Sequence, residues 1–174
     1  MSRRRKSTDA SAIELHDVSF SVNRGEILGI AGLVGAGRTE TARAIFAADR
    51  KSAGAITFNG KSADYNEPAD AIAAGMGYCS EDRKTQGIVP GMTVGENLAF
   101  PLRNRGVPKA EIDTRVRQIA DLLDLTPNLG RKATRLTADA KQKISLGRGL
   151  VRSDVAAVLF DEPLTVIDPH LKWQ

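Results

Sequence analysis

Residues 25–40, GEILGIAGLVGAGRTE, carry the strongest structural signal in this chain of 174 residues. Residues 26–31 are a short apolar run of the kind that forms a buried parallel strand. A glycine-rich turn follows, and residues 38–47 then read as a helix. A strand, a glycine-rich turn and a helix in direct succession predict a unit of an α/β fold.

The turn itself, residues 32–39 with the sequence GLVGAGRT, matches the P-loop pattern except that Arg38 stands where lysine is expected. Its glycines let backbone N–H groups turn inward around phosphate oxygens, and the following helix adds its positive N-terminal end. Thr39 would place a hydroxyl on Mg²⁺. Arg38 can still neutralise phosphate, although its planar group is larger than an ammonium. On its own, the motif is equally compatible with a glycine-rich turn between a strand and a helix that binds no ligand. The residues expected around the phosphates are Gly32, Gly35, Ala36, Gly37, Arg38, Thr39 and Glu40.

A second element near the other end of the chain supports the first. Residues 155–160 are apolar throughout and lead into Asp161 and Glu162, as in a Walker B strand. Asp161 would hold Mg²⁺, and Glu162 would position or deprotonate an attacking water. An ordinary strand with an acidic turn is the alternative. Both elements in order, each at the carboxyl end of a strand, favour nucleotide binding.

Further strands and helices alternate along the chain, which again indicates an α/β fold. Helix 108–124 has the clearest apolar stripe, and residues 93–96 have the spacing of a capping box. Asn59-Gly60 is a strong hairpin signal. The other expected elements are strands at 13–22, 54–60 and 76–80 and helices at 68–74 and 138–150.

Composition excludes several classes of protein. The net charge of +4 comes from residues 3–6, RRRK, and the charges of the remaining chain balance. The composition therefore gives no support to nucleic-acid binding. Residues 1–12 are expected to be a disordered basic tail. The longest charge-free apolar run, 27–37, is too short to span a bilayer. No apolar segment follows the basic N-terminus, so no secretory signal is predicted. The single cysteine, Cys79, fits a reducing cytosol and is expected to be buried and inert.

With these motifs the sequence resembles the ATP-binding cassette of ABC transporters over residues 13–174. The stretches at 25–40 and 77–100 (GYCSEDRKTQGIVPGMTVGENLAF) look like the second cassette of ribose, xylose and galactose importers. The stretches LTADAKQKISLGRGLVRSD, VLFDEPLTVIDPHLKW and AFPLRNRGVPKAEID look like the cassette of glycerol or glycerol-phosphate importers. The changeover falls near 92–100, which we interpret as a hybrid.

The resemblance assigns further residues. Glu81 falls at the Q-loop position, which in this family touches Mg²⁺ and couples to the membrane domain. The alternative is that Glu81 is an acidic loop residue exposed to solvent. Asp168 matches the D-loop aspartate that crosses the dimer interface. The signature Leu-Ser-Gly-Gly-Gln aligns with residues 136–140, LTADA, so both glycines are missing and Asp139 brings a negative charge. The helix that follows resembles the family's signature helix at Gln142, Lys143 and Arg148. The alternative is that these are polar side chains exposed to solvent. No adenine-stacking aromatic or switch histidine is assigned, and His170 does not take that role.

The architecture that this resemblance implies is a RecA-like P-loop NTPase core at 13–88 and 151–174 with an inserted helical subdomain at 89–150, incomplete at the C-terminus. The implied function is the ATP-binding subunit of a sugar or polyol importer, with ATP and Mg²⁺ as cofactors. Permease subunits and a second cassette are the implied partners. The implied location is cytoplasmic, at the inner face of the cell membrane without insertion.

Hydrolysis by the isolated chain is expected to be weak, because the P-loop carries arginine and the signature has no glycine. Two alternatives stay open: a non-hydrolytic nucleotide-binding or scaffold module, and a truncated hybrid cassette without activity. A P-loop kinase or GTPase ranks last, because the guanine motif is missing and Asp161-Glu162 suits attack by water.

Overall fold

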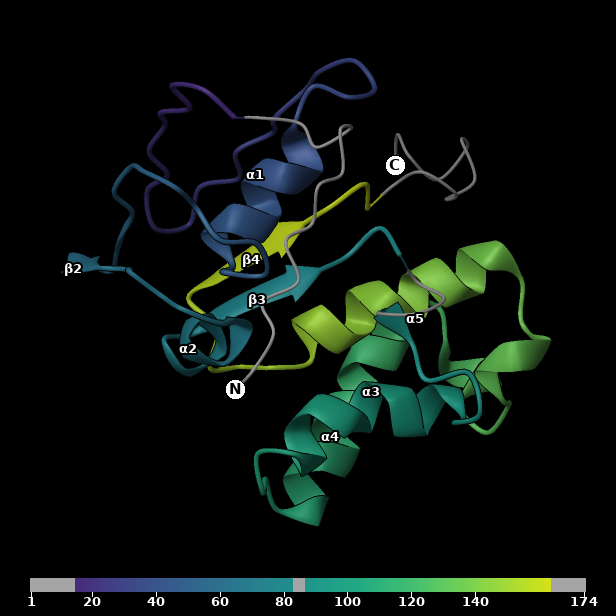
Figure 1. Cartoon of the computed structure of the whole chain (residues 1–174). Helices are drawn as coiled ribbons and strands as arrows, with labels where there is room; N and C mark the ends of the chain where they lie inside the picture. Colours follow the sequence, from purple (N-terminus) through teal and green to yellow (C-terminus); the bar gives the residue numbers. More distant parts are fainter. Residues whose placement is uncertain (1–14, 83–86, 164–174) are drawn as a thin grey trace, which may run out of the picture.

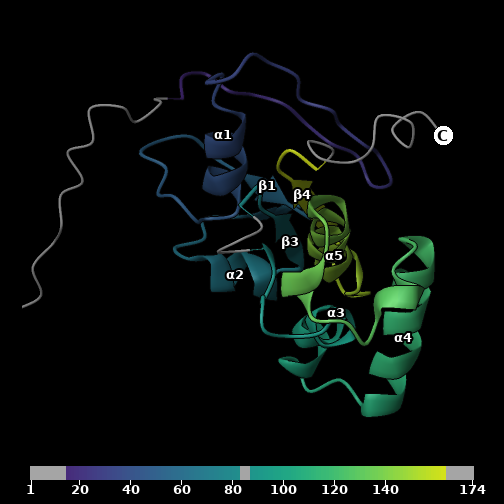
Figure 2. The same cartoon turned by 90° about the vertical axis from the view of Figure 1, so that its right-hand side faces the viewer.

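The computed structural model describes residues 15–82 and 87–163 and combines helices with two small sheets (Figure 1). In both views α1, α2 and the strands lie together, and α3, α4 and α5 form a second group (Figures 1 and 2). The elements in chain order are α1 (Arg38–Ile45), β1 (Thr57–Phe58), β2 (Lys61–Ser62), α2 (Pro68–Ala73), β3 (Met76–Cys79), α3 (Val94–Arg103), α4 (Lys109–Leu122), the 3-10 turns η2 (Thr126–Asn128) and η3 (Ala133–Arg135), α5 (Ala138–Leu150) and β4 (Ala157–Phe160).

The parallel pair β3 and β4 positions the candidate site. Met76 pairs with Ala157 at one end and Cys79 with Phe160 at the other. The N–H of Asp161 then donates to the carbonyl of Cys79 at 2.9 Å, which extends the pairing one residue past β4. Because both strands run in the same direction, the residues that follow them meet at one edge of the sheet.

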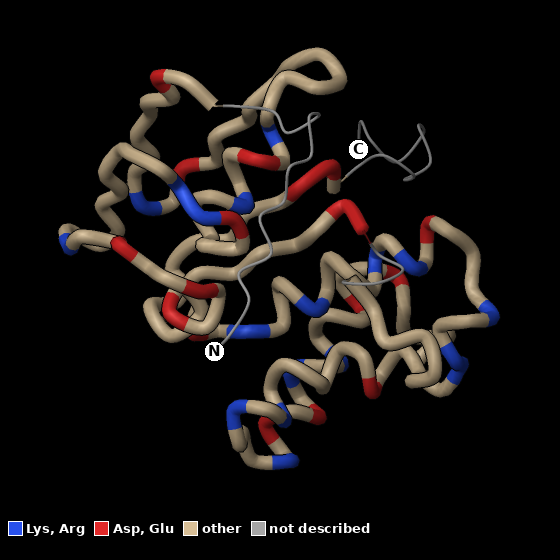
Figure 3. The backbone as a smooth tube through the Cα atoms, in the orientation of Figure 1, with Lys and Arg blue, Asp and Glu red and all other residues tan. Residues whose placement is uncertain are grey.

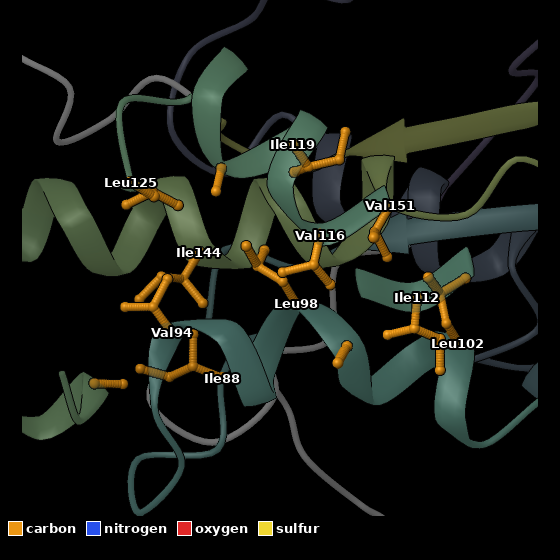
Figure 4. Close-up of a cluster of buried hydrophobic side chains, with 13 residues drawn as sticks. Ile88, Val94, Leu98, Leu102, Ile112, Val116, Ile119, Leu125, Ile144 and Val151 are labelled. Atoms are coloured by element: carbon orange, nitrogen blue, oxygen red, sulfur yellow. The ribbon is translucent and has the colours of Figure 1, made fainter. Parts of the chain in front are cut away.

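The larger core lies among the helices. Leu98 of α3, Ile144 of α5 and Val151 are fully buried, and side chains from α4 close the cluster (Figure 4). Helix α3 begins with the capping box that the sequence predicts, since the Thr93 and Glu96 side chains each accept from the other's backbone N–H. None of the helices in the described ranges is long and apolar enough to cross a membrane.

Most predicted elements are confirmed within one to three residues at their ends. Helices 68–74, 108–124 and 138–150 correspond to α2, α4 and α5. The hairpin turn is also confirmed, since Asn59 and Gly60 have φ values of 50° and 74° between β1 and β2. Two positive φ values are the requirement of a type I′ turn, which explains the Asn-Gly pair.

The predictions of strands at 26–31 and 13–22 are wrong for the residues that the structure describes. Residues 15–31 contain no strand, and their side chains are exposed, with Ile27 at 97% and Phe20 at 48%. Apolar pattern alone does not supply a neighbouring strand, and in the described chain β3 and β4 pair only with each other. The strand predicted at 54–60 is shorter, reduced to β1. The basic tail, residues 1–12, lies outside the described residues.

The single cysteine is buried, as predicted. Cys79 is 8% exposed, and a Cβ added to Gly149 of α5 would collide with its Sγ, so the helix lies directly on the thiol. Burial raises the pKa of the Cys79 thiol to about 12. We therefore expect iodoacetamide at pH 8 to alkylate the folded protein at least about tenfold more slowly than the urea-unfolded chain, because the thiolate is the nucleophile. Mass spectrometry measures both rates, and equal rates would show that α5 does not cover β3.

Candidate phosphate-binding site

The glycine-rich turn has the backbone that its sequence requires. Gly35 and Gly37 have φ values of 82° and 81°, and Gly37 is the N-cap of α1. A Cβ on Gly32 would lie 2.9 Å from the Cβ of Ala36, so the loop curls too closely for a side chain there. The turn therefore leads into α1 with glycines in left-handed conformations that other residues rarely adopt.

The structure brings together the P-loop threonine and the Walker B aspartate, which are 122 residues apart in the sequence. The Thr39 hydroxyl donates to Oδ1 of Asp161 at 2.9 Å. Asp161 is only 5% exposed, directly after β4, while Thr39 lies in the first turn of α1. The two residues predicted to bind Mg²⁺ thus lie in contact, as a shared Mg²⁺ site would require.

A second contact joins the same two motifs, between Arg38, which precedes Thr39, and Glu162, which follows Asp161. The Arg38 guanidinium lies 2.9 Å from Oε1 of Glu162, and both side chains are about one-third exposed. Glu162 has a φ of 51°, the left-handed region that a non-glycine residue adopts rarely. Arginine pairs well with carboxylates as well as phosphates, so Glu162 would compete with a bound phosphate for the Arg38 guanidinium.

Tyr78, which sequence reasoning did not select, is also part of this site. Its hydroxyl donates to Oδ2 of Asp161 at 2.9 Å, so both carboxylate oxygens accept a hydrogen bond. Burial, followed by this hydrogen bond, raises the pKa of the Tyr78 phenol, which keeps it a donor. The sequence offered one signal for this residue, a tyrosine on the predicted strand 76–80. The structure adds that this strand pairs with the Walker B strand.

The remaining predicted residues are placed less closely. Glu81 follows β3 at the edge where Asp161 and Glu162 follow β4, and its side chain is exposed; the backbone view shows these acidic stretches at adjacent strand ends (Figure 3). Glu40 lies in the first turn of α1, where an acidic side chain favours the helix N-terminus. Asp168 lies outside the described residues.

Helix α5, which carries the degenerate signature, contacts the chain just after β4. The Gln142 amide donates to the carbonyl of Pro163 at 2.8 Å and to that of Glu162 at 3.4 Å. Gln142 is 4% exposed, and Arg148 lies 5.2 Å from the centre of the Phe100 ring. Both side chains therefore make internal contacts, and the solvated alternative is wrong for them.

The donor set fits a magnesium ion bound together with phosphate. A threonine hydroxyl and a carboxylate are hard oxygen ligands, and Mg²⁺ usually takes one or two protein oxygens plus phosphates and waters. No cluster of three or more His, Cys, Asp or Glu side chains occurs in residues 15–82 and 87–163. Thr39 and Asp161 are thus compatible with the predicted site, in which Mg²⁺ would be bound together with phosphate.

Comparison with known proteins agrees with this geometry. A phosphate turn before a helix, joined to an acidic strand end, is typical of P-loop NTPases. The family profile described as "ABC transporter" matches residues 15–165, and the chain belongs to this family. Membership implies an α/β fold of the P-loop NTPase type.

The similar proteins carry names of sugar importers. One, from Burkholderia ambifaria, is named as a ribose/galactose/methyl galactoside import ATP-binding protein and is 43% identical over 165 residues, which cover 91% of this chain and 32% of that protein. A protein of the same name from Agrobacterium fabrum is 43% identical over 166 residues, covering 90% and 32%. An arabinose import ATP-binding protein from Rhizobium johnstonii is 41% identical over 163 residues, covering 90% and 32%. The chain thus spans about a third of the length of these relatives.

These alignments extend well beyond residue 100. A single monosaccharide-type relative therefore covers parts of both segments, the one before and the one after the changeover near 92–100. The resemblance to cassettes of the ribose and galactose type is confirmed. A hybrid origin stays a prediction.

Proposed function

We propose that this chain is an ATP-binding cassette of a sugar or polyol importer and that it binds MgATP between the P-loop and the end of β4. The observation that carries this proposal is the 2.9 Å hydrogen bond from Thr39 to Asp161. It joins the start of the P-loop helix to the Walker B strand, which is the juxtaposition that metal-assisted nucleotide binding needs. The relatives named as import ATP-binding proteins support the transport context.

In the proposed site each residue has one task. The backbone of residues 32–37 would surround the phosphates, and Arg38 would neutralise them. Thr39 and Asp161 would hold Mg²⁺, which supplies charge neutralisation at the phosphate oxygens when bound. Glu162 would accept a proton from water, and Glu81 and Asp168 would act at the Q-loop and D-loop.

The proposed architecture follows from the same elements. In this proposal residues 13–88 and 151–174 would belong to the RecA-like core, whose described elements include α1, β3 and β4. Residues 89–150 would belong to the helical subdomain, with α3, α4 and α5. By family resemblance this subdomain would contact permease subunits at the inner face of the membrane. A second cassette would complete each site by dimerisation.

Hydrolysis by the isolated chain is proposed to be weak. The Arg38–Glu162 ion pair occupies the proposed catalytic carboxylate, and the signature segment 136–140 lacks the glycines that would dock a partner's phosphate. A multiple-turnover assay of phosphate release measures this. We expect turnover at least about tenfold below that of an intact sugar-importer cassette assayed in parallel, because removing a single preorganised phosphate or oxyanion contact costs 10²–10³-fold in other enzymes.

The Glu162→Gln variant is the control for that assay, because it removes the carboxylate and keeps the shape. The proposal of weak hydrolysis would be contradicted if the unmodified chain turned over ATP as fast as an intact cassette and Glu162→Gln abolished this activity. MgATP binding with background phosphate release in both proteins would favour the second candidate, a non-hydrolytic nucleotide-binding module, which the same ion pair supports.

A further inference from the structure

The buried Asp161 carboxylate is held by two hydroxyls of different mobility. Thr39 donates to Oδ1 and Tyr78 donates to Oδ2, each at 2.9 Å. Thr39 has a short side chain whose hydroxyl can rotate to donate or accept elsewhere. The two hydrogen bonds therefore differ in how readily each can be given up.

Tyr78 is fixed by its surroundings. Its ring packs against Phe46 with centroids 5.3 Å apart, and its backbone pairs with Leu159, two residues before Asp161. The phenol lies on β3 and the carboxylate directly follows the paired strand β4, so a change in the Asp161 rotamer would break the hydrogen bond from the half-buried Tyr78 hydroxyl to Oδ2.

We propose that Tyr78 is a positioning residue, which holds Oδ2 of Asp161 so that Oδ1 faces Mg²⁺ together with the Thr39 hydroxyl. This inference rests on the proposed function. Thr39 exchanges its hydrogen bond to Oδ1 for the metal, whereas Tyr78 keeps its bond to Oδ2 in both states. Groups that orient a metal ligand in this manner influence metal affinity without touching the metal.

The test compares Tyr78→Phe with Tyr65→Phe, the matched change at the chain's other tyrosine. ATP affinity is measured by calorimetry in EDTA and across a Mg²⁺ titration. We expect Tyr78→Phe to raise the half-saturating Mg²⁺ concentration about tenfold, as for other residues that orient a metal ligand, and to change the affinity in EDTA by less than about twofold. Tyr65→Phe is expected to match the unmodified chain in both.

Three outcomes overturn the inference. Equal Mg²⁺ dependence in Tyr78→Phe and the unmodified chain would overturn it alone, leaving the proposed function intact. An equal loss of affinity with and without Mg²⁺ would show that Tyr78 acts only on the fold. If the unmodified chain binds ATP no more tightly with Mg²⁺ than in EDTA, the proposed function fails as well.

A second measurement avoids the substitution of Tyr78. With 3-fluorotyrosine incorporated, ¹⁹F NMR gives one signal for each of the two tyrosines, and Tyr65→Phe assigns them. We expect Mg²⁺ added to the ATP complex to shift the Tyr78 signal and leave that of Tyr65 in place. A Tyr78 signal that does not respond to Mg²⁺ would overturn the inference.

Discussion

Thr39→Ala is expected to weaken MgATP binding by at least about tenfold, because it removes a proposed Mg²⁺ ligand and a loss of about 1.4 kcal/mol already corresponds to a factor of ten. The variant removes the hydroxyl that donates to Asp161 and that would serve as a metal ligand. It also leaves Oδ1 of the buried Asp161 without this donor. Calorimetric titration with MgATP measures the effect.

Thr41→Ala is the matched control on the same helix. Thr41 donates to the carbonyl of Gly37 at 2.7 Å, within the first turn of α1, and makes no predicted contact with nucleotide. Its loss is expected to change the affinity by less than about twofold, because hydrogen bonds of this kind stabilise helices little. Unchanged affinity in Thr39→Ala, or equal losses in both variants, would contradict the assignment of the P-loop.

Leu98→Ala is expected to lower the free energy of unfolding by about 3 kcal/mol, within the range of 2–5 kcal/mol for buried leucines. Leu98 is fully buried at the centre of the helical core (Figure 4). A Cβ on Gly147 of α5 would lie 2.5 Å from its Cδ2, so α5 packs closely against this side chain. Equilibrium urea unfolding measures the change.

Leu122→Ala is the control, because this leucine at the end of α4 is 68% exposed. Its substitution is expected to cost less than about 0.5 kcal/mol, as is usual for surface positions. Similar losses of stability in the two variants would show that α3 and α5 do not form the core described for them.

The helices could be predicted because their signals are local. Helix α4 follows Pro108 and has its apolar residues on one stripe, and α3 begins at a capping box within four residues. The strands at 13–22 and 26–31 could not be decided in this way. A short apolar run satisfies the pattern of a buried strand, but the ladder depends on a neighbour that lies elsewhere in the chain.

In the candidate site, too, only some of the residues could be predicted from the sequence. Motif spacing brought Thr39 and Asp161 into one hypothesis, and the structure places them in contact. Tyr78 and Gln142 were missed or undervalued, because their roles depend on which strand and helix pack beside β4. The Arg38–Glu162 ion pair joins the same two motifs, but nothing in the sequence indicated that these two side chains would contact each other.

Titration of MgATP into the purified chain, repeated with ATP in EDTA, addresses the claim that these two motifs form one nucleotide site. We predict saturable binding with one ATP per chain and an affinity at least about tenfold lower in EDTA, because Mg²⁺ would join Thr39 and Asp161 to the phosphates. No saturable binding at millimolar MgATP, or binding of equal affinity in EDTA, would contradict it.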